Sequence, residues 1–342
     1  MSDKSAIEWT DATWNPIRGC SLVSDGCRSC YAMKQAHRFS GKGQAYEGLT
    51  RLGPNGPTWT GKIALIEDAL DEPLHWKKPR RVFVNSMSDL FHEGVPAEFI
   101  ERVFSVMALA ERHTFQVLTK RADRMRAWFT ARRFDVKGFA VLQTESGDGH
   151  YAFPWPLPNV WLGVSVENQH FADERIPLLL QTPAAVRFIS AEPLLGPVDL
   201  RKVSDSQHGP DWHPLIGWKT RYQHKAQSPD ECSLGVESSS CDARGVQHPK
   251  LDWVIVGGES GPDARLFDLA LARSIVQQCK AAGVPVFVKQ LGTAFAIQQP
   301  TWSTARRHDR KGGDPSEWPA DLRIREFPAA MRVCAHSRIE VP

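Results

Sequence analysis

The segment from Arg81 to Thr119 decides the fold of this chain. It reads RVFVN at 81–85, then a stretch with apolar residues three or four positions apart at 96–112, then FQVLT at 115–119. Continuous apolar runs of this length predict buried strands, and the spacing between them predicts an amphipathic helix. A strand, a helix and a second strand in this order are typical of a unit whose two strands lie parallel.

The same unit recurs along the rest of the chain. We predict further strands at 160–166, 186–190, 253–256 and 286–288, further helices at 121–133, 169–180 and 269–282, and one more strand either at 62–65 or just before Cys20. Apolar strands that alternate with amphipathic helices are typical of parallel sheets covered by helices. The sequence therefore predicts an α/β fold, a full or partial parallel β/α (TIM-like) barrel with loop insertions. An open doubly wound sheet is the alternative.

The predicted barrel covers residues 1–298 and includes a cysteine-rich loop near its N-terminus. Two stretches with little periodicity, about 138–158 and 204–250, are expected to be insertions. Residues 299–342 form a C-terminal extension that contains the basic cluster RRHDRK at 306–311.

The composition indicates a globular protein rather than a general nucleic-acid binder. The chain has 342 residues, with 42 basic and 39 acidic side chains and a net charge of +3. We expect most of the 12 Trp residues to lie in the core. We see neither a signal peptide nor an apolar run that would span a membrane, so we expect a cytoplasmic protein without a membrane partner.

Polar side chains follow each predicted strand at the point where it ends. They are Asn85 to Asp89, Thr119 to Arg121, Glu167 and Asn168, Ser190 to Glu192, Gly257 to Ser260, and Lys289 and Gln290. The carboxyl ends of parallel strands meet at one rim of a barrel, so these side chains are expected to surround one site. The alternative is that they only cap the helices that follow.

Three cysteines near the N-terminus form the sharpest functional signal. Cys20, Cys27 and Cys30 lie within eleven residues, with six and then two residues between them. Thiolates are soft ligands that favour zinc or iron–sulfur clusters. Three ligands would leave one iron of a [4Fe–4S] cluster open, whereas His37 would have to complete a closed zinc site.

The chain resembles a phage-associated "gp thirty-seven / gp sixty-eight" family of unassigned function. The resemblance is carried by WNPIRGC (14–20), GC (26–27), CYA (30–32), FVNSMSDLF (83–91), SAEPLLG (190–196), VIVGGESG (254–261) and FVKQLG (287–292). That family is in turn distantly similar to radical S-adenosylmethionine enzymes. Those enzymes combine a partial β/α barrel with three cysteines near the N-terminus and an open iron that binds the cofactor.

This resemblance implies a [4Fe–4S] cluster held by the three cysteines and an S-adenosylmethionine beside it. It implies cofactor-binding roles for Tyr31, Asn85, Ser86, Ser190, Glu192, Gly257, Gly258, Glu259 and Lys289. Glu259 or Glu192 would accept from the ammonium group of the cofactor, and Lys289, Lys120 or Arg121 would pair with its carboxylate. The chain departs from those enzymes in its cysteine spacing. Its Gly-Gly-Glu element also follows a late strand, where the two glycines would equally suit a tight turn.

The phage association suggests a nucleic acid as the substrate of a repair or modification reaction, with an electron donor as a second partner. The basic runs at 77–81 and 306–311 would then contact phosphates. One alternative is a zinc-containing nucleic-acid-binding protein without radical chemistry. Another is a metal-assisted hydrolase that uses Asp89, His92 and Glu93.

Overall fold

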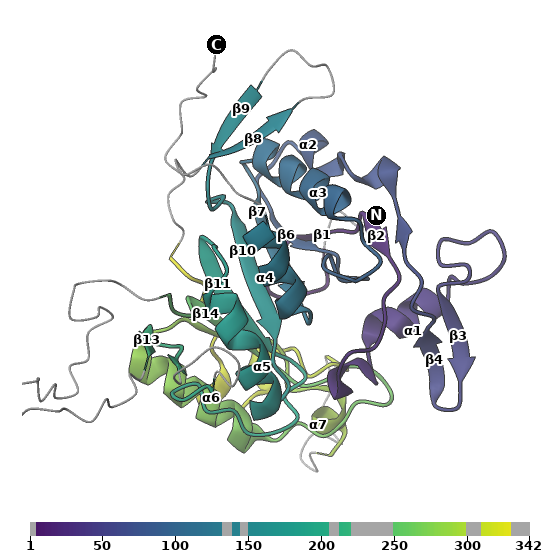
Figure 1. Cartoon of the computed structure of the whole chain (residues 1–342). Helices are drawn as coiled ribbons and strands as arrows, with labels where there is room; N and C mark the ends of the chain where they lie inside the picture. Colours follow the sequence, from purple (N-terminus) through teal and green to yellow (C-terminus); the bar gives the residue numbers. More distant parts are fainter. Residues whose placement is uncertain are drawn as a thin grey trace, which may run out of the picture.

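A seven-stranded parallel sheet forms the centre of the computed structural model, which describes residues 5–131, 139–143, 150–204, 212–219, 249–298 and 309–329 (Figure 1). The strands follow one another across the sheet in chain order. They are β1 (Ala12–Trp14), β6 (Arg81–Val84), β7 (Thr114–Thr119), β10 (Val160–Ser165), β11 (Val186–Ala191), β14 (Trp253–Val256) and β15 (Val286–Val288). The sheet curls into a half-barrel, with β1 and β15 at its two edges.

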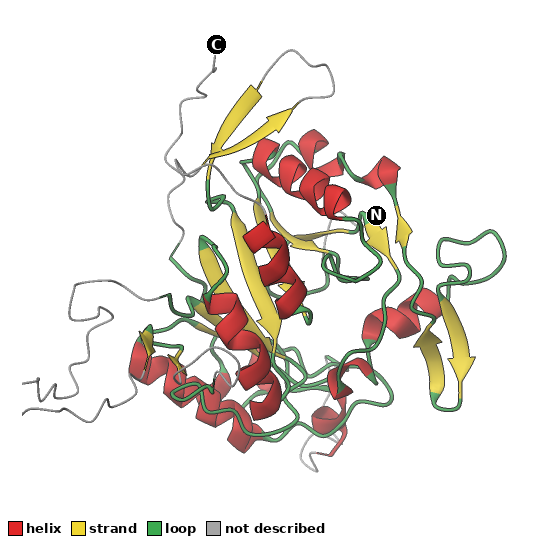
Figure 2. Cartoon of the chain, viewed as in Figure 1, coloured by secondary structure: helices red, strands yellow, loops and turns green. Residues whose placement is uncertain are grey.

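This strand order confirms the predicted partial β/α barrel. A doubly wound sheet reverses direction at a switch point, and this sheet does not. Helices lie along the outer face of the sheet between the strands (Figure 2). They are α3 (Ala97–Leu109), α4 (Ala122–Ala131), α5 (Gln169–Leu180) and α6 (Leu269–Ala282). Their apolar sides and the outward-facing valines and leucines of the strands form the main hydrophobic core.

The predicted elements agree closely with the observed ones. All six predicted strands from 81 to 288 are present. The segment before Cys20 holds two short strands, of which β1 joins the main sheet and β2 (Ile17–Arg18), just before Cys20, does not. Residues 62–65 contain only β5 (Ala64–Leu65), which pairs with β2 (Ile17–Arg18) outside the main sheet. The predicted helices end within four residues of the observed bounds.

The inner face of the half-barrel changes from aromatic to polar along the strands. Inward-facing residues alternate with core residues, so Phe83 of β6 is followed by Asn85 just after the strand, and Phe188 by Ser190 on β11. The aromatic end is closed by Trp9, whose ring lies 4.7 Å from that of Phe83. The polar end carries the carboxyl termini of the strands and remains accessible.

The connection between β1 and β6 carries the three cysteines and several short elements. They are η1 (Asp25–Cys27), α1 (Tyr31–His37), the hairpin of β3 (Thr50–Gly53) and β4 (Gly56–Trp59), η2 (Glu67–Ala69) and α2 (Glu72–His75). Figure 1 shows α1 and the hairpin together at one side of the molecule. Ala32, Met33 and Ala36 of α1 pack there against Leu49 and Trp59.

The predicted insertions and extension contain further short elements. The first insertion holds a hairpin of β8 (Phe139–Gln143) and β9 (His150–Pro154), and the second holds β12 (Trp212–His213) and β13 (Trp218–Lys219). After α7 (Thr293–Gln298), the described part of the extension includes η4 (Pro315–Glu317) and η5 (Ala320–Leu322). It packs back on the half-barrel, because Phe327 contacts Trp253 at 5.3 Å between ring centroids. Among the described helices, none combines the length and apolarity that a bilayer span requires.

Candidate functional site

A cavity of about 210 Å³ lies at the carboxyl ends of the strands. Side chains from six strand ends line it, as the sequence predicted. They are Asn85, Ser86, Asp89, Thr119, Lys120, Arg121, Ser165, Ser190, Glu192, Glu259, Ser260 and Lys289. The cysteine loop, residues 19–30, forms the opposite wall. The apolar side chains of Ile7, Trp9, Phe83 and Leu118 also line it, so one cavity combines thiols, polar strand ends and apolar surface.

Gly257 and Gly258 are not among the lining residues, although both were predicted to bind a cofactor. A Cβ atom on Gly258 would lie 2.7 Å from the backbone oxygen of Leu291 and 2.9 Å from Cβ of Phe267. The close packing of three chain segments is therefore sufficient to require glycine at position 258.

All three cysteines line the cavity together. Burial is the main reason that the pKa of Cys20 is raised to about 12; Asp89, Cys30 and Cys27 act in the same direction and Arg121 opposes them. Burial also raises the pKa of Cys30, with Cys27 acting in the same direction. Metal binding would have to displace the protons of these thiols.

The described residues contain no group of three or more His, Cys, Asp or Glu side chains arranged around the position of a single metal ion. A zinc ion needs four ligands at about 2.0–2.3 Å from one point. A [4Fe–4S] cluster is larger, and each of its thiolates binds a different iron. The finding therefore weighs against a single-ion site and leaves the three-cysteine cluster site a prediction.

His37 lies away from the cysteines. Its Nδ1 atom is 3.0 Å from Oγ1 of Thr50. Cys30 and His37 stand at opposite ends of α1, which are about 10 Å apart along the helix axis. The described residues therefore do not form the zinc site in which His37 would be the fourth ligand beside the three cysteines.

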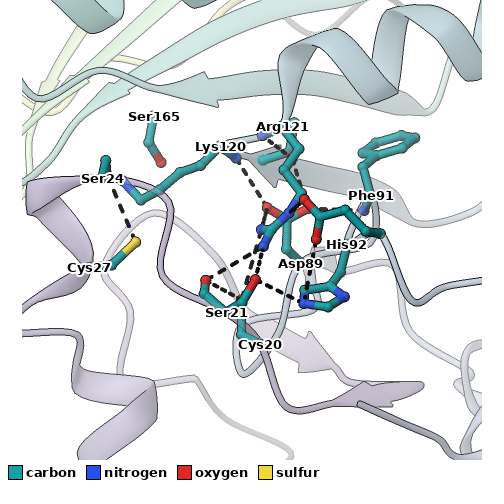
Figure 3. Close-up of polar contacts among 12 residues, drawn as sticks. Cys20, Ser21, Ser24, Cys27, Asp89, Phe91, His92, Lys120, Arg121 and Ser165 are labelled. Atoms are coloured by element: carbon teal, nitrogen blue, oxygen red, sulfur yellow. Dashed lines mark hydrogen bonds and ion pairs between the residues drawn. The ribbon is translucent and has the colours of Figure 1, made fainter. Parts of the chain in front are cut away.

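Arg121 joins the cysteine loop to the end of β7 (Figure 3). Its side chain is 4% exposed and donates to Oδ2 of Asp89 at 3.0 Å and to Oε1 of Glu93 at 2.9 Å. It also donates to Oγ of Ser21 at 2.7 Å, and its Nη1 lies 3.9 Å from Sγ of Cys20. Burial alone lowers the pKa of Arg121, but Asp89 and the other anionic neighbours raise it above the ordinary value.

The carboxylate of Glu167 forms a second connection between the half-barrel and the cysteine loop. It is fully buried and accepts hydrogen bonds from Lys120, from Oγ of Ser24 at 2.6 Å and from Nη1 of Arg175 at 2.9 Å. A Cβ atom on Gly26 would lie 2.5 Å from this carboxylate. Glycine at that position therefore allows the loop to pack directly on Glu167.

Two more carboxylates of the cavity are paired. Glu192 accepts from Nζ of Lys289 at 2.7 Å. Glu259 accepts from two side-chain nitrogens of Arg265, which reaches on to the backbone oxygen of Asp25. The carboxylate of Glu259 is thus paired with Arg265, although the sequence predicted that it would accept from the ammonium group of a cofactor.

Among the described residues that line the cavity, Nε1 of Trp9 and both amide atoms of Asn85 are buried without a hydrogen-bond partner, and Asn85 is the one at the polar end. It is 2% exposed, and neither its amide nitrogen nor its amide oxygen has a hydrogen-bond partner among the described residues. Its φ of 60° is a left-handed conformation that is costly for a residue with a side chain. A buried amide without partners costs free energy, so this position is explained best by a ligand that would satisfy it.

Ser165 is a residue of the site that was not predicted. Ser165 is the register partner of Ser190 on the neighbouring strand, and both buried serines line the cavity. The last residue of strand 160–165 faces inward two positions after Gly163, so the period-two pattern contained the signal. The predicted Tyr31 and Ser86 lie at the rim, where the Tyr31 hydroxyl donates to the backbone oxygen of Ser86 at 2.7 Å.

The remaining predicted groups lie elsewhere or have other partners. Asp89 and Glu93 bind Arg121, and Nε2 of His92 lies 3.0 Å from Oγ of Ser21. All three residues of the hydrolase alternative therefore already have partners within the protein. The basic run at 77–81 precedes β6 and so lies at the opposite end of the sheet from the cavity. Arg306, Arg307 and His308 fall outside the described residues.

The comparisons with known proteins identify a family and no individual relative. No curated protein and no solved structure matches the chain significantly. A family model described as "Protein of unknown function (DUF5131)" matches residues 4–318, which is most of the chain. The chain therefore belongs to this family.

Proposed function

We propose that this protein is an iron–sulfur enzyme of the radical S-adenosylmethionine type. Cys20, Cys27 and Cys30 would hold three irons of a [4Fe–4S] cluster, and the cofactor would occupy the adjoining cavity. One observation carries the proposal. Three cysteines of one loop and a buried, unsatisfied Asn85 line a single cavity at the carboxyl rim of a half-barrel.

The cluster and S-adenosylmethionine, when bound, would supply the chemistry: cleavage of the cofactor by one electron to a radical that abstracts hydrogen from the substrate. The protein would bind and orient the cofactor. Asn85 offers a donor and an acceptor, and Ser165 and Ser190 offer two hydroxyl groups beside it. The aromatic floor around Trp9 and Phe83 would exclude water from this end.

The pair of Glu192 and Lys289 suits the amino-acid end of the cofactor. An amino acid carries an ammonium group and a carboxylate on one carbon, and this pair presents the two opposite charges 2.7 Å apart. Glu259 is the weaker choice because Arg265 occupies its carboxylate. Lys120 and Arg121 are bound to Glu167 and Asp89.

A nucleic acid remains the proposed substrate class, with the phage association as its support. Glu192 and Lys289 are assigned to the cofactor, and Lys120, Arg121 and Arg265 are paired with carboxylates of the protein, so the polar groups left to meet a substrate are neutral. The part of the substrate that enters the cavity would therefore be an uncharged group rather than a phosphate.

The proposal is tested by incubating anaerobically purified protein with S-adenosylmethionine and dithionite and measuring 5′-deoxyadenosine. We expect turnover by the wild type and by Cys279→Ala, a control because Cys279 is buried in α6. We expect none from Cys30→Ala. Equal product from the wild type and Cys30→Ala, or none from iron-loaded wild type, would contradict the proposal.

A further inference from the structure

The cysteine loop is held from outside rather than by its own secondary structure. Its backbone hydrogen bonds in the described residues run within the loop, as from Cys27 to Ser24 and from Cys30 to Cys27, or join it to α1, as from Lys34 to Cys30. They create a short turn but do not fix that turn relative to the sheet. The sheet meets the loop through buried side chains instead.

Two of these side chains come from the ends of adjacent strands. Arg121 follows β7 and binds Ser21, the residue after the first cysteine. Glu167 follows β10 and binds Ser24, three residues before the second cysteine. Both contacts join a charged group to a hydroxyl, which makes them stronger than ordinary hydrogen bonds.

Each of the two side chains is itself fixed by the half-barrel. Asp89 holds Arg121, and the other oxygen of Asp89 accepts from the Thr119 hydroxyl at 2.7 Å. Arg175, which is 1% exposed, holds Glu167 and also donates to the backbone oxygen of Ser165 at 2.9 Å. The geometry of the strand ends is thus passed to the loop through two short chains of buried contacts.

We infer that Arg121 and Glu167 are positioning residues that hold the cysteine loop in a fixed place against the half-barrel before any metal binds. Arg121 has a second effect, because its guanidinium group lies beside Sγ of Cys20. Hydrogen bonds to cluster sulfurs help to set the reduction potential of iron–sulfur clusters. The inference about the loop stands on the apoprotein, whereas its consequence for a cluster rests on the proposed function.

Variants on the loop side give the cleanest test. Ser21→Ala removes the hydroxyl that Arg121 binds and leaves the pair of Arg121 and Asp89 intact. Ser24→Ala does the same for Glu167. Ser105→Ala is a matched control, because the side-chain hydrogen bond of Ser105 in the described part of the chain is local, to the backbone oxygen of Glu101 in its own helix at 2.9 Å. Arg121→Lys keeps the charge and removes the planar fork that spans several partners.

Hydrogen exchange of the iron-free full-length protein is the first readout. We expect amides of residues 20–27 to exchange roughly ten-fold faster, or more, in Ser21→Ala, Ser24→Ala and Arg121→Lys. Protection of the sheet should be unchanged, and Ser105→Ala should match the wild type. Exchange of the loop at the wild-type rate in all three variants would overturn the inference.

The loaded protein gives a second readout that a merely structural role would not change. We expect faster loss of iron to a chelator and an altered electron paramagnetic resonance spectrum of the reduced cluster in the same three variants. Identical spectra and loss rates in wild type and variants would overturn the inference for the cluster. A wild type that binds no iron would instead contradict the proposed function, while the exchange experiment would still decide the role of Arg121 and Glu167.

Discussion

Replacing Glu167 by glutamine tests the buried network most severely. The substitution keeps the shape of the side chain and removes one negative charge. Arg175 and Lys120 then lose their common anion. Lys120 is 19% exposed and would turn toward solvent, but Arg175 is 1% exposed and would stay buried.

The expected cost follows from this difference. Breaking a buried ion pair by removing one partner costs about 3–5 kcal/mol. The glutamine oxygen still accepts one hydrogen bond and Lys120 is able to relax, so we expect the lower end, about 3 kcal/mol. For a protein of this size the melting temperature would fall by roughly 5 °C.

Urea denaturation followed by circular dichroism measures the change. Glu174→Gln is the matched control, because Glu174 also contacts Arg175, at 3.6 Å, but is 49% exposed. We expect the control to cost less than about 0.5 kcal/mol. A Glu167→Gln variant as stable as Glu174→Gln would refute the view that this carboxylate anchors the network.

The difference in stability between the wild type and Glu167→Gln should depend on pH. Burial alone raises the pKa of Glu167, but Lys120 and Arg175 together lower it below its ordinary value of 4.5. A lowered pKa means that the stabilisation is present above the ordinary value and is lost as the pH falls through the folded-state value. The stability difference between wild type and Glu167→Gln should therefore be constant near neutral pH and shrink below about pH 4.5.

Three further predictions concern single positions around the cavity. Asn85→Gly should raise the free energy of unfolding by about 1 kcal/mol, because it relieves the left-handed backbone and an unpaired amide, and should weaken S-adenosylmethionine binding in calorimetry. No gain in stability would contradict the unsatisfied state of that amide. Gly163→Ala should cost about 1–3 kcal/mol, because the new Cβ would lie 2.5 Å from the ring of Phe188; Phe188→Leu should recover part of the loss in urea denaturation. Gly26→Ala should displace the loop from Glu167 and lower the iron content per chain, and a normal content would count against that contact.

The fold was largely predictable because continuous apolar runs and helical spacing are local patterns. The run at 160–166 shows this, since it is buried along its whole length as β10. The strand β1 was harder to define because it is only three residues long and has a polar residue in the middle. The hairpin of β3 and β4 was missed because its PNGP turn interrupts both short strands.

The site was predictable as a location but not as a set of contacts. Polar residues after parallel strands must gather at one rim, and Asn85, Ser190 and Lys289 do. Which acidic side chain pairs with which basic side chain depends on the twist and register of the sheet. The pairing of Lys120 with Glu167, 47 positions away, is therefore not visible in sequence spacing.

Iron and acid-labile sulfide analysis of anaerobically purified protein tests the central claim most directly. We predict about four of each per chain for the wild type and for Cys279→Ala, and a marked loss for Cys20→Ala, Cys27→Ala and Cys30→Ala. Stoichiometric zinc in place of iron, or iron that survives all three substitutions, would contradict the account.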